Sequence, residues 1–330
     1  MEAMLKLDAN EGFPEPPPAE YAAFRDREAA RRYPDSRPLE RALADRLGLE
    51  ASRVVVGAGA DDIIERYARV MLRPGGVALG TEPAFDSYAA ATERAGGRYV
   101  GLPRLPEAPF PAQALAAEAR RSRPAFLVFA SPDNPGGGVL GPADLLELAD
   151  TGTPILFDAV YSPFATEQDV YRLAPDVAGC TVLGSFSKAY GLAGLRVGWA
   201  VSSPPMAARI RAAGPPYPVA TTSLAAALCV LDGGDGNLER RVVRVKAQRD
   251  ELRALLVGLG ARCWRGEANF VAARVRDAGA LAGALAARAV LVRTWPEKPS
   301  CAGLVRITCP GDDAEFERLA TALRSVKEFI

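Results

Sequence analysis

The chain has 330 residues, of which 49% are apolar, and its 40 basic and 40 acidic residues give a formal net charge of zero. This length is sufficient for a full hydrophobic core and predicts two domains. The balanced charge argues against a nucleic acid or a membrane surface as partner. The sequence contains no histidine, which excludes histidine-based catalytic triads and histidine metal sites.

Cysteine spacing and hydropathy narrow the class of protein further. The five cysteines are scattered and form no CxxC pair, so we expect free thiols, with neither a metal site nor a disulfide framework. No run of 18 uncharged apolar residues occurs, and the first residues do not resemble a signal peptide. We therefore expect a cytoplasmic protein with no membrane partner.

The first two thirds of the chain alternate between strand-like and helix-like segments. Strands are predicted at 53–56, 76–80, 98–102, 125–130, 154–158, 180–184 and 196–202, and helices at 61–72, 86–95, 143–150 and 206–213. Short apolar strands that alternate with helices are typical of a largely parallel sheet covered on both faces. The fold class predicted is therefore α/β, with a seven-stranded, mainly parallel sheet.

The pattern changes after the seventh strand. A long amphipathic helix is predicted at 238–259, followed by strands at 268–275, 290–293 and 303–308 and helices at 278–288 and 312–327. This order indicates a second, smaller α+β domain, and the Asp-Gly-Gly-Asp-Gly segment at 232–236 marks the break before it. We expect an N-terminal arm at 1–30, a large domain at 31–235 and a small domain at 236–330.

Two of the predicted strand ends carry turns suited to ligand binding. After the first strand, a glycine turn leads through Ala60 and Asp61 into a helix, where free backbone N–H groups can hold a phosphate. The alternative is that Asp61 only caps the helix. After the fourth strand, Asn134 lies between Pro132 and Pro135, which stiffen the turn and direct its amide into a cleft. The alternative is a purely structural asparagine.

The next two strand ends carry charged groups. Asp158 ends a buried strand, where a carboxylate needs a partner such as a protonated pyridine nitrogen, and Tyr161 follows as a donor to a phenolate oxygen. The alternative is a helix cap beside a core tyrosine. Lys188 follows another buried strand, between two nearby serines and Arg196. A lysine can form a Schiff base, and hydroxyls with an arginine suit a phosphate dianion, although a surface lysine would give the same local pattern.

Taken together, these strand ends indicate a site for pyridoxal 5'-phosphate (PLP). The amino-acid sequences of the motifs extend this interpretation. The segments that resemble a known family are 7–11, 32–35, 131–135, 187–196, 216–218, 268–270 and 305–308. They resemble the fold type I PLP-dependent aminotransferases, and most closely the histidinol-phosphate aminotransferase family. The resemblance covers nearly the whole chain. It implies a large PLP-binding domain with a smaller C-terminal domain.

The resemblance also implies roles for individual residues. The cofactor-binding set is Tyr33, Ala60, Asp61, Phe85, Asn134, Asp158, Tyr161, Ser185, Ser187, Lys188 and Arg196, with Lys188, Asp158 and Tyr161 catalytic. The substrate-binding set is Asn10, Glu11, Tyr217, Arg293 and Arg306. Lys188 would be both the Schiff-base lysine and the proton-transfer base. Tyr33 would reach the cofactor phosphate of a second subunit, so a homodimer with shared active sites is implied.

The activity implied is transamination of L-histidinol phosphate with 2-oxoglutarate. In that reaction, Arg306 would bind a carboxylate and Arg293 the side-chain phosphate. The sequence departs from the family pattern at four places: Gly12 in the arm, Gly136 where threonine is usual, Ala159 where an acidic residue is usual, and Gly184 where arginine is usual. An aromatic or pathway-specialised aminotransferase, a decarboxylase of an amino-acid phosphate such as threonine phosphate, and a non-catalytic binding protein of the same fold remain alternatives.

Overall fold

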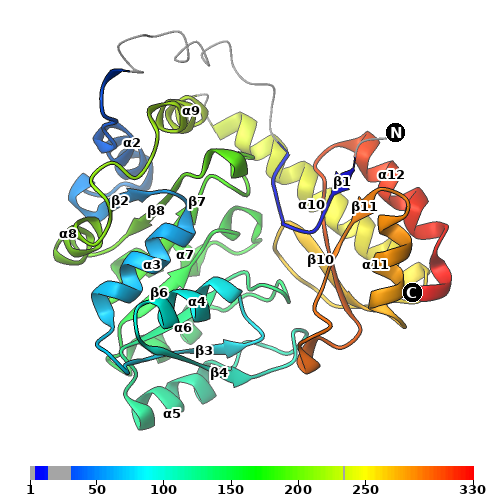
Figure 1. Cartoon of the computed structure of the whole chain (residues 1–330), viewed down its shortest axis with the longest axis horizontal. Helices are drawn as coiled ribbons and strands as arrows, with labels where there is room; N and C mark the ends of the chain where they lie inside the picture. The colour runs from blue at the N-terminus through cyan, green and yellow to red at the C-terminus, as the bar shows by residue number, and fades with distance from the viewer. Residues whose placement is uncertain (1–3, 14–30, 233–234) are drawn as a thin grey trace.

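The large sheet organises most of the chain. The computed structural model describes residues 4–13, 31–232 and 235–330 (Figure 1). The sheet has the order β2 (Val54–Gly57), β8 (Gly198–Val201), β7 (Cys180–Ser185), β6 (Ile155–Asp158), β5 (Phe126–Ala130), β3 (Val77–Glu82) and β4 (Arg98–Pro103). Only β8 runs antiparallel to its neighbours. All seven predicted strands are thus present in a mainly parallel sheet, which confirms the predicted fold class.

Helices cover both faces of this sheet. Those assigned are α2 (Arg37–Leu47), α3 (Ala60–Met71), α4 (Asp86–Arg94), α5 (Ala112–Ser122), α6 (Pro142–Ala149), α7 (Asp169–Leu173), α8 (Pro204–Ala212) and α9 (Thr221–Asp232). On one face, Leu115 and Leu145 of α5 and α6 pack with Phe129 of β5. On the other, Tyr88 of α4 packs with Val128. Adjacent strand residues therefore face opposite layers, as the strand period of two requires.

The C-terminal part forms a smaller layer beside the large sheet. It contains α10 (Asp235–Gly258), β9 (Arg262–Cys263), β10 (Phe270–Arg274), α11 (Ala278–Ala286), β11 (Val290–Leu291), β12 (Arg293–Thr294), β13 (Leu304–Thr308) and α12 (Asp313–Arg324). The antiparallel order is β12-β13-β10-β9. Strand β1 (Leu5–Lys6) of the N-terminal arm pairs with β11, so the arm is attached to this layer (Figure 1).

Several elements differ from the predicted ones. Helices α2, α5, α7 and α9 come in addition to the predicted helices. The predicted strand at 196–202 begins at Gly198, because Arg196 has a left-handed backbone with φ of 51° that no strand can include. Short 3-10 turns lie at Ala51–Arg53, Ser162–Phe164, Ala174–Asp176, Ala193–Leu195, Pro299–Cys301 and Lys327–Phe329.

The predicted domain limits at 30 and 235 remain predictions, because residues 14–30 and 233–234 lie outside the described part of the chain. Within the described part, none of the helices has the length and apolarity that a bilayer crossing requires.

Candidate active site

All of the predicted cofactor residues except Tyr33 meet in one cavity of about 350 Å³. It lies at the carboxyl ends of β5, β6 and β7, beside the start of α3. The predicted residues that line it are Glu11, Ala60, Asp61, Phe85, Asn134, Asp158, Tyr161, Ser185, Ser187, Lys188 and Arg196. In the sheet order, β4 lies on one side of β3, and β5, β6 and β7 follow on the other side, so the strand order reverses between β3 and β5. Open α/β sheets bind ligands in this position, outside the carboxyl ends of the strands.

Lys188 lies in the loop that follows β7. Its Nζ donates to the carbonyl oxygen of Ala9 at 3.2 Å and lies 5.7 Å from the centroid of the Tyr161 ring. The loop is tied at its start, where the backbone N–H of Ser187 donates to Ser185 Oγ at 3.0 Å. The lysine amine is therefore held between the N-terminal arm and the end of β6.

Asp158 is a buried carboxylate with two hydrogen-bond donors. Tyr88 Oη donates to Oδ2 at 2.7 Å, and the backbone N–H of Val160 donates to Oδ1 at 3.1 Å. Burial raises the pKa of Asp158 from 3.8 to about 6, and these hydrogen bonds oppose that rise. A cationic ligand group beside this carboxylate would restore its charged form. The site thus fits a protonated pyridine nitrogen.

Tyr88 is a site residue that the sequence analysis does not predict. It lies one helical turn after Phe85, and the two rings pack edge to face with centroids 5.7 Å apart. Burial raises the pKa of Tyr88 well above its ordinary value, so its hydroxyl stays protonated and acts as a donor. Its spacing of three residues from Phe85 at the start of a helix is the signal that would have indicated it.

The start of α3 forms a cradle for an anion. Arg196 donates to Asp61 Oδ2 at 2.9 Å and to Ser187 Oγ at 3.3 Å, which brings the guanidinium to the first turn of the helix. A Cβ atom at Gly198 would lie 2.5 Å from the Ala60 nitrogen, so only glycine allows β8 to pass this turn. Backbone N–H groups, hydroxyls and a guanidinium at a helix N-terminus are the donors that bind a phosphate.

The Asp61 carboxylate is itself engaged at this cradle. Ser87 Oγ donates to Asp61 Oδ1 at 2.9 Å, on the side away from Arg196. Ser87 was not predicted, because its partner lies 26 positions earlier in the sequence. These contacts leave the backbone amides as the groups through which Ala60 and Asp61 would hold a phosphate.

A second layer of polar contacts lies behind the cavity. Asn134 Oδ1 accepts a hydrogen bond from Arg306 Nη1 at 2.6 Å, and Arg306 also donates to the Asp8 carbonyl oxygen. Burial lowers the pKa of Arg306 to about 10. Its guanidinium lies over the rings of Phe270 and Trp295, at 5.4 and 5.3 Å. This arginine is therefore fixed in position.

Arg293 is the cross-strand partner of Arg306. It lies over the Trp295 ring at 5.4 Å, and its Nη2 atom is 4.0 Å from Asp86 Oδ2. The predicted substrate arginines thus occupy neighbouring strands, with Arg306 buried and Arg293 half-exposed.

Besides Arg293 and Arg306, three further predicted site residues do not line the cavity. Tyr33 and Tyr217 stack on each other, with centroids 4.5 Å apart and planes at 10°, and both are exposed. Asn10 is buried, and its side-chain amide donates to Tyr161 Oη at 2.9 Å. The direct substrate contacts proposed for Asn10 and Tyr217 remain predictions.

Two of the departures from the family pattern, Gly12 and Gly184, have steric reasons. A Cβ atom at Gly12 would lie 1.8 Å from the Lys188 carbonyl oxygen, so the arm can pass the lysine loop only with glycine there. A Cβ atom at Gly184 would lie 2.2 Å from the Trp199 indole, which fills the space beside this position. Both glycines permit a close approach that a larger residue would prevent.

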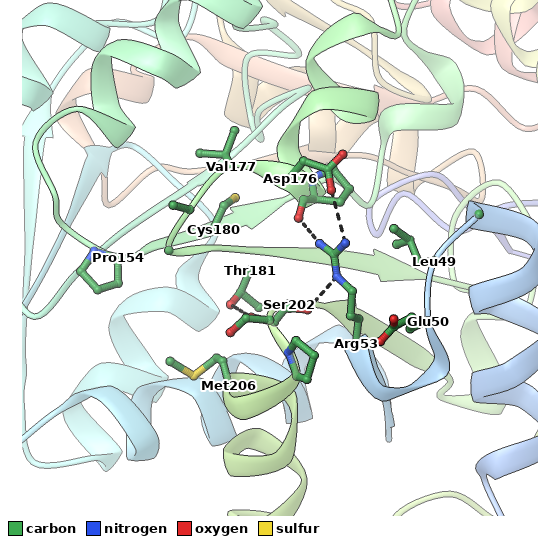
Figure 2. Close-up of a pocket in the computed structure, with 16 residues that line it drawn as sticks. Leu49, Glu50, Arg53, Pro154, Asp176, Val177, Cys180, Thr181, Ser202 and Met206 are labelled. Atoms are coloured by element: carbon green, nitrogen blue, oxygen red, sulfur yellow. Dashed lines mark hydrogen bonds and ion pairs between the residues drawn. The ribbon is translucent and has the colours of Figure 1, made fainter.

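A larger cavity, of about 580 Å³, lies at the opposite edge of the large sheet. Figure 2 shows Arg53 reaching across it; its guanidinium donates to the Ser202 carbonyl oxygen at 3.2 Å and to Asp176 Oδ1 at 3.3 Å. Thr181 and Ser202 are joined through their hydroxyls at 2.8 Å. These groups bond to one another, and none of the predicted site residues lines this cavity.

Comparison with known proteins agrees with the chemistry of the first cavity. The profile of the family described as Aminotransferase class I and II matches residues 3–323. A histidinol-phosphate aminotransferase of Roseiflexus castenholzii is 31% identical over 99% of this chain and 90% of its own length. Histidinol-phosphate aminotransferase 2 of Caulobacter vibrioides is 34% identical over 98% of this chain and 86% of its own.

The crystal structure of histidinol-phosphate aminotransferase from Sinorhizobium meliloti in complex with pyridoxal-5'-phosphate superposes with a TM-score of 0.86. That match has 25% identity and covers 99% of this chain and 91% of the other. Fold and site define a PLP-dependent enzyme of fold type I. The chain belongs to the class I and II aminotransferase family.

Proposed function

We propose that the protein transfers the amino group of L-histidinol phosphate to 2-oxoglutarate, a step of histidine biosynthesis that gives imidazole acetol phosphate and glutamate. The observation that carries this proposal is the pair of arginines on neighbouring strands, Arg306 buried and Arg293 half-exposed. Guanidinium groups bind carboxylates and phosphates in two-pronged geometry. The names of the relatives support the same substrate.

The residues of the cavity divide the work of this reaction. PLP, when bound, supplies an electron sink for the charge that develops at the substrate Cα. We assign to Asp158 the stabilisation of the positive charge on the pyridine nitrogen, and to Lys188 the removal and return of the Cα proton. Phe85 would pack against the ring face, which keeps water from it.

The remaining cavity residues hold the cofactor. Asn134 and Tyr161 would bind the ring oxygen. The phosphate would be held by Ser185, Ser187, Arg196 and the amides of Ala60 and Asp61.

We also propose that the enzyme is a homodimer with shared active sites. Tyr33 and Tyr217 form a stacked pair, 79% and 50% exposed, that does not reach the cavity of its own chain. Exposed aromatic pairs are typical of interface surfaces. A second subunit would cover the pair and bring Tyr33 to a cofactor phosphate. The cytoplasmic location stays a prediction.

The visible absorption spectrum tests the reaction. We expect L-histidinol phosphate to abolish the band of the lysine-bound cofactor and 2-oxoglutarate to restore it. If only another amine did so, an aromatic or pathway-specialised aminotransferase would replace the proposed substrate. Release of carbon dioxide from an amino-acid phosphate would instead indicate the decarboxylase. A protein that takes up no PLP would contradict the whole assignment.

The role of Arg293 has its own test. We expect Arg293→Ala to raise KM for L-histidinol phosphate about tenfold or more, because a charge-assisted contact to the phosphate is lost. The control is Arg262→Ala. Arg262 lies on β9 of the same small sheet as Arg293, is exposed, and pairs with Glu107. An unchanged KM in Arg293→Ala would show that this arginine does not bind the phosphate.

A further inference from the structure

Asn10 joins three parts of the molecule behind the cavity. Its backbone is left-handed, with φ of 54°, and it is 1% exposed. Its backbone N–H donates to Thr308 Oγ1 at 3.1 Å, and its carbonyl oxygen accepts from Asn269 Nδ2 at 3.1 Å. Its side-chain amide reaches Tyr161. The arm, the small sheet and the end of β6 therefore meet at one residue.

The side chain of Asn10 has a defined direction in this network. The Thr308 hydroxyl lies 3.0 Å from Asn10 Oδ1 and 2.8 Å from the Leu7 carbonyl oxygen, so its single proton serves these two acceptors. The amide oxygen then faces Thr308, and the amide nitrogen donates to Tyr161 Oη at 2.9 Å. Asparagine is one of the few residues other than glycine that tolerate the left-handed backbone required at this position.

The direction of this contact decides what the tyrosine can do. A tyrosine hydroxyl carries one proton and accepts through its lone pairs. Because Tyr161 Oη accepts from Asn10, its own proton remains available to a group in the cavity. A hydrogen-bond chain of this kind also strengthens the second bond, since each donor polarises the next.

We propose that Asn10 is a positioning residue that acts through Tyr161: it turns the tyrosine proton toward the ring oxygen of PLP. This inference rests on the role of Tyr161 stated under the proposed function. It replaces the direct substrate contact predicted for Asn10 with a contact to the tyrosine behind the cofactor. The arm thereby becomes part of the cofactor site, because Asn10 lies between Ala9, which accepts from Lys188, and Glu11, which lines the cavity.

The pH midpoint of the visible absorption change of the bound cofactor measures this contact without turnover. A hydroxyl that donates to the ring oxygen favours its anionic form, so loss of the donor should raise the midpoint. We expect Tyr161→Phe to raise it by about one pH unit. Asn10→Ala should raise the midpoint by a smaller amount. Once Tyr161 is replaced by Phe there is no tyrosine proton to orient, so Asn10→Ala and Asn10→Asp should then cause no further shift through its orientation.

Asn10→Asp tests the direction. A carboxylate only accepts, so it would turn the tyrosine proton away from the cavity and raise the midpoint to the value of Tyr161→Phe. Any effect of the added charge on the midpoint is also present in the Tyr161→Phe background. The midpoint shift caused by Asn10→Asp in the wild type minus the shift that it causes in Tyr161→Phe therefore measures the effect of the tyrosine orientation alone. A midpoint in Asn10→Asp that equals the wild-type value would overturn the proposal.

Asn269→Ala is the control for the anchoring of the arm. It removes the hydrogen bond to the Asn10 carbonyl and leaves the contact to Tyr161, so the midpoint should stay at the wild-type value. A shift as large as that of Asn10→Ala would mean that arm anchoring, not the tyrosine contact, sets the midpoint, which contradicts the inference. If Tyr161→Phe itself left the midpoint unchanged, the role of Tyr161 would fail first, and the inference with it.

Discussion

The two cavities at opposite edges of the large sheet differ in chemistry more than in size. The cavity at the carboxyl ends of the strands, of about 350 Å³, is the smaller, yet it holds the lysine and a buried carboxylate of raised pKa. The other, of about 580 Å³, is lined by residues of the loops and strand ends around Arg53, and no lysine is among the described residues that line it. Volume therefore does not identify the active site here; the groups at the strand ends do.

An arginine paired with an aspartate occurs in each cavity, which makes the comparison direct. The Arg196 side chain is 48% exposed and lies beside the helix N-terminus, whereas that of Arg53 is 20% exposed and braces two carbonyl oxygens of the loops. The first arginine retains surface for a ligand. The second is mostly covered by the loops whose carbonyl oxygens it binds.

The largest expected effect on activity concerns Lys188, which lines the first cavity, whereas no lysine of the described chain lines the second. We expect Lys188→Ala to reduce transamination by about a thousandfold or more, because both the covalent attachment and the proton transfer are lost. Lys327→Ala removes an exposed lysine near the C-terminus and should leave activity within about twofold. Substantial turnover by Lys188→Ala in a coupled assay would place the chemistry elsewhere.

The buried carboxylate gives a pH-dependent prediction. A carboxyl group whose pKa is raised on folding, from 3.8 to about 6 for Asp158, destabilises the fold as pH rises between these values, because the unfolded chain ionises first. In the cofactor-free protein, we expect Asp158→Asn to gain on the order of 3 kcal/mol over wild type from about pH 4 to about pH 6. Urea unfolding measures this difference, and a difference that does not change with pH would contradict it.

Tyr88 sharpens the comparison, since its hydroxyl donates directly to Asp158. We expect Tyr88→Phe to weaken PLP binding about tenfold, because a charge-assisted hydrogen bond to the carboxylate is lost. The matched control is Tyr171→Phe, which removes a hydroxyl that bonds to Ser131 at 3.1 Å. Absorbance titration with PLP should show an affinity within about twofold of wild type for the control. Equal losses of PLP affinity in both variants would show that the effect of Tyr88→Phe comes from general packing and not from the hydrogen bond to Asp158.

The smallest expected effect on activity concerns the larger cavity. We expect Arg53→Ala to keep kcat and KM within about twofold while lowering the melting temperature, because Arg53 braces loops far from the lysine. Arg196→Ala should do the reverse, with weaker PLP binding and a smaller change in stability. A large loss of kcat in Arg53→Ala would show that the two cavities are coupled.

The sequence predicts the large sheet well because its signals are local. Each strand is a short apolar run, and the polar residues that follow it, such as Asn134, Asp158 and Lys188, meet at one edge because parallel strands end together. The strand near Arg196 is misplaced at its start for a backbone reason, the left-handed φ of that residue.

Contacts between distant segments could not be predicted in the same way. The Tyr88–Asp158 hydrogen bond joins residues 70 positions apart, and the Asn10–Tyr161 bond joins residues 151 apart. No local pattern in the sequence marks either pair. The steric need for Gly12 likewise appears only when the arm lies against the Lys188 loop.

Chemical mapping of the cofactor attachment tests the central claim most directly. The chain has five lysines, at 6, 188, 246, 298 and 327, so the answer is unambiguous. The holoenzyme is reduced with borohydride, digested and analysed by mass spectrometry. The account predicts the reduced cofactor on the peptide that contains Lys188. Its presence on any other lysine, or on none, would contradict it.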